Sequence, residues 1–138
     1  MVDVEVRKNI DASLDKVWAL FSNFGDMSWL EAGQTVEAIG EGPGMIRRLS
    51  MPGIEPFDEI LISMDHDKHE YSYRIPKNAV IPFDDYQAVV TISGNEQSAE
   101  VVWASTFGEA GLDPADARKM IEDNYLMMLN MAAEKLTA

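Results

Sequence analysis

The feature that most constrains the fold of this chain is its last stretch, Asp113 to Leu136, whose pattern predicts one long one-sided helix. Asp113 is a good N-cap, Pro114 suits the first helical position, and Lys135 lies near the negative end of the helix dipole. At a rise of roughly 1.5 Å per residue the helix would run about 34 Å, enough to cross a small domain. The upstream chain should therefore build a surface on which this helix lies.

The buried side of this helix is predicted to be apolar, with one amide in it. A turn of about 100° per residue gathers the following residues on one stripe: Met120, Ile121, Asn124, Met128, Met131 and Ala132. Methionine adapts to irregular space, so Met128 and Met131 either line a cavity or fill a core. An unpaired buried amide is costly, so Asn124 needs a partner, which a strand, a water molecule or a ligand would supply.

Length and composition limit the classes of protein to consider. At 138 residues the chain is expected to form a single domain over residues 1–138. It has neither a 20-residue apolar run nor a signal-peptide pattern at its start, which predicts a cytoplasmic protein without membrane insertion. The absence of cysteine excludes disulfides and thiolate chemistry. The net charge of −13 argues against nucleic acid and anionic membrane surfaces as partners.

The rest of the chain is predicted to be mostly strands. Alternation from Val2 to Arg7 indicates a first strand, and Ser13 begins a helix that should end near residues 23–25. Met27 to Leu30 is a candidate second short helix. Glycine, proline and asparagine turns then separate strands expected near 34–40, 44–51, 56–65, 69–75, 85–93 and 99–107. Short connections favour an antiparallel α+β fold.

Several stretches, taken in order, resemble the SRPBCC (START/Bet v 1-like) superfamily, and within it the polyketide cyclase/dehydrase-like branch. These stretches are Asp15–Phe24, Gly42–Arg47, Asp58–Leu61, Tyr71–Tyr73, Asp85–Tyr86 and Val102–Phe107. The resemblance implies a helix-grip fold, in which a seven-stranded antiparallel curved sheet wraps around the long terminal helix and encloses an apolar cavity. It also implies that the loops at 51–56 and 76–82 lie at the cavity mouth. It says less about activity, because this fold hosts many functions.

Strand parity gives a set of candidate ligand-binding residues. Alternate residues share a face, which groups Tyr71 with Tyr73, Tyr86 with Ala88, and Trp103 with Ser105. Their hydroxyls and indole N–H would orient a ligand in an otherwise apolar pocket. The alternative is an aromatic core whose polar tips reach the surface. The predicted ligand-binding set is Tyr71, Tyr73, Ala88, Trp103, Ser105, Asn124, Met128 and Met131.

Arg47 and Glu59 form the charged pair of greatest interest. If the hairpin turns around Gly53, the two residues are equidistant from the turn and face each other across neighbouring strands. The resemblance places that face inside. The local pattern disagrees, because Ile60, Ile62 and Met64 form the more apolar face of the second strand. If those three point outward, they make an apolar patch suited to a homodimer contact, and a surface ion pair of little consequence is the remaining alternative.

Other chemistry has little support in the sequence. The segment Asp65 to His69 holds two histidines and two aspartates, but it occupies a turn and no further histidine exists to complete a metal site. We therefore expect a solvated turn and no metal. No serine-hydrolase elbow, phosphate loop or dinucleotide fingerprint is present, so no cofactor is predicted.

Two functional hypotheses follow. The first is binding of a small hydrophobic molecule, aromatic polyketide-like or lipid-like, with or without cyclase or dehydratase chemistry. In the catalytic version Glu59 is the general acid or base, Arg47 and Tyr86 stabilise an oxyanion, and Asn124 orients the substrate. The second is a protein-interaction module of the kind that assists chaperones or respiratory components, with a filled core and no ligand.

Overall fold

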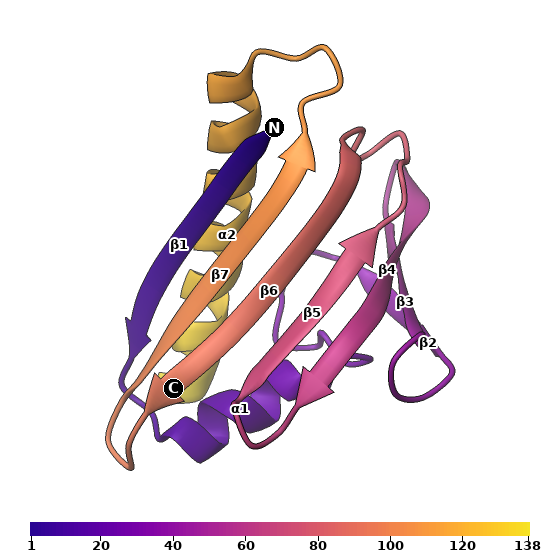
Figure 1. Ribbon diagram of the computed structural model, residues 1–138. Helices are drawn as coiled ribbons and strands as arrows, with labels where there is room; N and C mark the ends of the chain where they lie inside the picture. The colour runs from indigo at the N-terminus through magenta and orange to yellow at the C-terminus, as the bar shows by residue number, and fades with distance from the viewer.

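A computed structural model describes the whole chain, residues 1–138, as a curved antiparallel sheet around one long helix (Figure 1). The strands are β1 (Val2–Ile10), β2 (Thr35–Ile39), β3 (Ile46–Met51), β4 (Ile54–Asp65), β5 (Glu70–Ile75), β6 (Asp84–Gly94) and β7 (Ala99–Gly108). The helices are α1 (Leu14–Ser22) and α2 (Pro114–Thr137). The order β1-β7-β6-β5-β4-β3-β2 pairs the first strand with the last. In Figure 1, α2 runs behind β1 and β7 along their length.

This architecture confirms the predicted helix-grip fold, and the predicted strands differ from the observed ones only at their ends. One short helix, not two, follows β1. Residues 27–30 form a single turn in which the amide of Leu30 donates to the carbonyl of Met27 over 2.9 Å. Ser13 and Asp113 cap α1 and α2 as expected, each accepting a hydrogen bond from backbone amides of the first helical turn.

The buried face of α2 is rotated from the predicted stripe. Met120 is 51% exposed, so its predicted burial is wrong. Tyr125 and Leu129 are buried instead, together with Ala117, Ile121, Met128 and Ala132. Tyrosine and leucine have large apolar surfaces. Burying both against the sheet stabilises the fold more than burying Met120 in their place would.

A bulge in β4 resolves the conflict over which face of this strand is buried. The register shifts between Leu61 and Ser63, so residues before and after the bulge obey different parity. Glu59 and Leu61 face inward, Ile62 is 41% exposed, and Met64 turns back to pack on the core. Ile60, Ile62 and Met64 therefore do not share one outward face, so the apolar patch expected for a homodimer contact is absent, and the homodimer itself stays a prediction.

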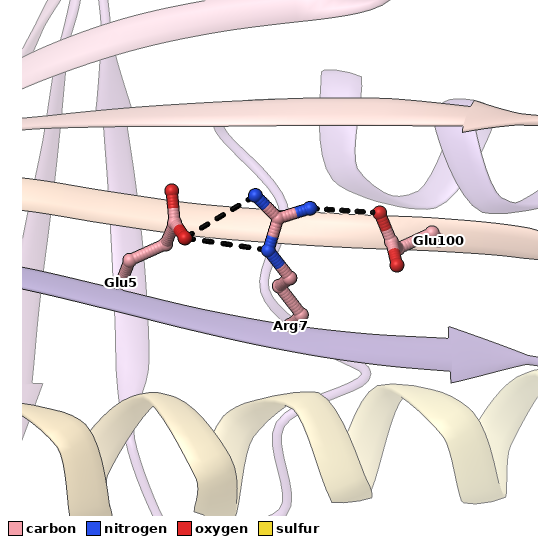
Figure 2. A network of polar contacts seen from close by, with 3 residues as sticks. All are labelled: Glu5, Arg7 and Glu100. Atoms are coloured by element: carbon pink, nitrogen blue, oxygen red, sulfur yellow. Dashed lines mark hydrogen bonds and ion pairs between the residues drawn. The ribbon is translucent and has the colours of Figure 1, made fainter.

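The outer face of the sheet carries charged side chains in water. Figure 2 shows Arg7 of β1 between Glu5 and Glu100. Arg7 Nη2 lies 3.2 Å from Glu5 Oε2, and Arg7 Nη1 lies 3.2 Å from Glu100 Oε1. The side chain of Arg7 is 55% exposed, so such pairs add little stability. Neither helix has the length and hydropathy needed to cross a membrane.

Candidate functional site

An apolar pocket of about 280 Å³ opens between the loop after α1, the β3–β4 hairpin and α2. Ten of its thirteen lining residues are apolar, and the polar ones are Arg47, Glu59 and Asn124. The lining residues are Met27, Leu30, Ala32, Arg47, Leu49, Met51, Phe57, Glu59, Ile81, Trp103, Asn124, Met127 and Met128. An apolar wall with a few convergent polar groups is typical of sites for small molecules, and this volume is near the lower end of their range.

Arg47 and Glu59 lie opposite each other on β3 and β4, as the spacing around Gly53 predicts. Arg47 Nε donates to Glu59 Oε1 over 2.5 Å, and both residues are buried, at 3% and 7% exposure. The next position along the same strands holds a second pair, Arg48 and Asp58, on the outer face. Two similar ion pairs thus differ chiefly in that one is buried at a pocket.

The guanidinium of Arg47 is held on several sides. It lies 4.0 Å from the ring centroid of Phe24 and 5.1 Å from that of Tyr73, and Nη1 donates to the carbonyl of Phe24 over 3.3 Å. Burial is the largest single influence and lowers the pKa of Arg47, but Glu59, Tyr71 and Tyr73 together raise it by more, so the pKa lies above its usual value. Arg47 is therefore a fixed cation that stays charged.

Two polar side chains at the pocket wall, Glu59 and Asn124, can form hydrogen bonds that the protein itself does not provide. Glu59 accepts its one protein hydrogen bond at Oε1, which leaves Oε2 for another donor. Asn124 is partly buried in α2, lines the pocket, and its side chain makes no hydrogen bond within the protein. The partner that the sequence analysis required for Asn124 is thus neither a strand nor a neighbouring side chain. A molecule in the pocket would find both groups unsatisfied.

Behind the pocket wall lies a cluster of buried hydroxyls. Trp103 Nε1 donates to the Tyr73 hydroxyl over 3.1 Å, and the hydroxyls of Tyr86 and Tyr125 are hydrogen bonded to each other. Ser105 is 4% exposed, and its Oγ has no hydrogen-bond partner. Burial raises the pKa of Tyr73, Tyr86 and Tyr125 well above the usual tyrosine value. These phenols are therefore neutral at physiological pH.

The structure divides the predicted site residues into two groups. Arg47, Glu59, Trp103, Asn124 and Met128 line the pocket. The other group lies in or against the core, away from the pocket wall: Tyr71, Tyr73, Tyr86, Ala88, Ser105 and Met131. The aromatic-core alternative fits this second group, although its polar tips are buried and do not reach the surface. Tyr86 is not among the lining residues, so its predicted role stays a prediction.

The turn at Asp65 to His69 holds no cluster able to bind a metal ion. Its histidines contact Trp18, however, instead of extending into water on all sides. Trp18 Nε1 donates to His66 Nδ1 over 3.1 Å, and the His69 ring packs edge-on against the indole at 5.4 Å.

Strand parity missed most of the apolar lining, because half of the missed residues lie in loops and the others lie in β3, β4 and α2, to which the parity argument was not applied. The missed residues are Met27, Leu30, Ala32, Leu49, Met51, Phe57, Ile81 and Met127. A signal existed for two of them, since Met51 and Ile81 belong to the loops that the resemblance placed at the cavity mouth. Apolar residues in loops are otherwise hard to assign, because no periodicity marks their direction.

Two other hollows are larger but less suited to a ligand. One, of about 360 Å³, lies on the outer face near Asp3, Glu5 and Gln87, and another, of about 390 Å³, lies beside Asp26 and His66. The charged side chains in both are exposed to water. Only the pocket at Arg47 combines an apolar wall with buried charge.

The fold and the pocket together define a helix-grip domain of the SRPBCC (START/Bet v 1-like) kind. The sequence matches the family described as polyketide cyclase / dehydrase and lipid transport over residues 1–136, and the chain belongs to that family. A comparison with curated proteins finds no match.

Solved structures share the fold at low sequence identity. An uncharacterised protein from Bacillus thuringiensis is 20% identical, with a TM-score of 0.87 over 99% of this chain and 100% of that one. Norcoclaurine synthase from Thalictrum flavum, solved with dopamine and hydroxybenzaldehyde, is 14% identical, with a TM-score of 0.74 over 98% of this chain and 86% of that one. Ara h 8.0201 is 12% identical, with a TM-score of 0.79 over 98% and 97%.

Proposed function

We propose that this protein binds a small, mainly apolar molecule in the pocket at Arg47 and Glu59. The observation that carries the proposal is a mostly apolar pocket with a buried ion pair in its wall. Burying two charges costs several kcal/mol per ion before their attraction is counted, and apolar residues of similar size would often serve stability as well. A pair retained at a pocket wall therefore favours a role in recognition.

The family and the neighbours support the same proposal at the level of ligand type. The family description includes polyketide cyclases and lipid transport, and norcoclaurine synthase was solved with two small aromatic molecules. An aromatic or lipid-like molecule with few polar groups would match the wall. The interaction-module alternative requires a filled core, and the pocket weighs against it.

Proton transfer is a second candidate function, favoured by the position of Glu59. Glu59 lines the pocket next to a fixed cation and its Oε2 has no partner in the protein, which suits a carboxylate that takes a proton from a carbon or hydroxyl beside an oxyanion. In this proposal Arg47 stabilises the oxyanion and Asn124 orients the substrate. Tyr86 has no part in it, because its hydroxyl bonds Tyr125 behind the wall.

Native mass spectrometry of gently purified protein tests the binding proposal. We expect an extra mass that disappears on denaturation. Ala32→Trp places a large ring at the pocket mouth and should abolish that mass, whereas Ala115→Trp places the same ring at an exposed position of α2 away from the pocket. An extra mass that survives Ala32→Trp unchanged would mean that the molecule binds elsewhere.

A further inference from the structure

The charge at the pocket wall is balanced before any ligand arrives. Arg47 and Glu59 are in direct contact at 2.5 Å, so the buried pair has no net charge. The Phe24 ring and carbonyl hold the guanidinium in place. Arg47 therefore cannot swing away from Glu59 to meet a ligand without losing these contacts.

This arrangement disfavours both signs of ligand charge. A carboxylate approaching Arg47 would lie beside the carboxylate of Glu59, and two like charges in one apolar site repel strongly. An ammonium group approaching Glu59 would meet the fixed cation in the same way. The protein charge of −13 adds a weaker, salt-screened repulsion against anions.

A neutral group that both donates and accepts hydrogen bonds fits the same wall. Its O–H would donate to Glu59 Oε2, and its oxygen would accept from the side-chain amide of Asn124, neither of which the protein uses. We propose that the pocket selects neutral, hydroxyl-bearing apolar molecules, such as phenols or enols, and rejects the corresponding carboxylates. The inference rests on the proposed function and narrows its ligand class.

Three probes of similar shape test the selection: 2-naphthol, 2-naphthoate and 2-methylnaphthalene. Equilibrium dialysis near neutral pH should give a dissociation constant for 2-naphthol at least about tenfold lower than for the other two, as expected for a hydrogen bond to a charged acceptor. If 2-naphthoate binds as tightly as 2-naphthol, the charge argument is overturned although the pocket binds ligands. If none of the three binds, both the proposed selection and the proposed binding function are contradicted.

Two single variants test whether the ion pair, and not the rest of the pocket wall, determines which ligand binds. Glu59→Gln leaves the cation of Arg47 unbalanced, so the affinity for 2-naphthoate should rise at least about tenfold. The matched control is Asp58→Asn, which removes the same charge from the adjacent pair on the outer face and should leave all three affinities unchanged. An unchanged affinity of Glu59→Gln for 2-naphthoate would contradict the selection mechanism.

A double variant covers the case in which Glu59→Gln does not fold. Arg47→Met with Glu59→Met removes both charges together, which buried pairs often tolerate. In this variant 2-methylnaphthalene should bind at least as tightly as 2-naphthol. A persistent tenfold preference for 2-naphthol would show that the ion pair is not what selects it.

Discussion

High pH should unfold this protein through its tyrosines. The chain has four tyrosines, Tyr71, Tyr73, Tyr86 and Tyr125, and each is at most 2% exposed. Burial raises the pKa of Tyr71 to about 12 from the ordinary value of 10.0 and raises the pKa of the other three as well. The folded state therefore keeps four phenolic protons that the unfolded state releases above about pH 10.

The size of the effect follows from these pKa values. Since each pKa is higher in the folded state, the stabilisation is complete below about pH 10 and is lost as the pH rises toward the folded-state values. One pH unit above 10, each unfolded tyrosine gains about 1.4 kcal/mol from ionisation, and the four together gain about 6 kcal/mol. The total stability of a domain this size is about 5–15 kcal/mol. Unfolding is thus expected between about pH 11 and pH 12.

The assay follows tyrosinate absorbance and far-ultraviolet circular dichroism in one alkaline titration. Both signals should change together in a single transition, because burial raises the pKa of all four tyrosines and keeps them largely protonated until the fold opens. Tyr71→Phe should remove a quarter of the absorbance change and lower the pH dependence of the unfolding free energy by about 1.4 kcal/mol per pH unit. A tyrosine that ionises near pH 10 while the circular dichroism is unchanged would refute the reasoning.

Three further predictions concern stability, each measured as the free energy of unfolding in urea. Glu59→Gln should cost about 3–5 kcal/mol because it leaves Arg47 buried and unpaired, whereas Asp58→Asn on the outer face should cost at most about 1 kcal/mol. Asp113→Ala should cost about 1 kcal/mol, since its side chain caps two amides of α2. Gly94→Ala should cost about 1–3 kcal/mol, because its Cβ would lie 2.3 Å from the carbonyl oxygen of Ser98.

Each of these predictions has an outcome that contradicts it. Equal costs for Glu59→Gln and Asp58→Asn would mean that the inner pair is solvated. An Asp113→Ala protein as stable as the native one would mean that the helix start needs no cap, and an unchanged Gly94→Ala would mean that the turn after β6 adapts freely.

The elements of this fold were predictable because each has a local signal. Val2 to Arg7 alternate, Ser13 and Asp113 mark helix starts, and turn residues separate the strands. The pairing of Arg47 with Glu59 agrees with the spacing around Gly53, but it also depends on a register shift between Leu49 and Met51 that the sequence does not indicate.

The features that were not predictable depend on tertiary packing. The bulge after Leu61 reverses which face of β4 the following residues occupy, and no glycine or proline near it indicates that β4 contains an extra residue there. The rotation of α2 depends on how Tyr125 packs against Trp103, with ring centroids 4.7 Å apart, which the helix sequence alone does not contain. Part of the pocket wall, namely Met27, Leu30, Ala32 and Ile81, comes from loop residues, whose direction is set by the rest of the fold.

A nuclear magnetic resonance titration with 2-naphthol tests the binding site most directly. We expect the indole N–H signal of Trp103 and the side-chain amide signals of Asn124 to shift, because both residues line the pocket. The indole N–H of Trp18 bonds His66 outside the pocket and should stay unchanged, which makes it an internal control. Shifts at Trp18 without shifts at Trp103 and Asn124 would place the ligand elsewhere and contradict the proposed site.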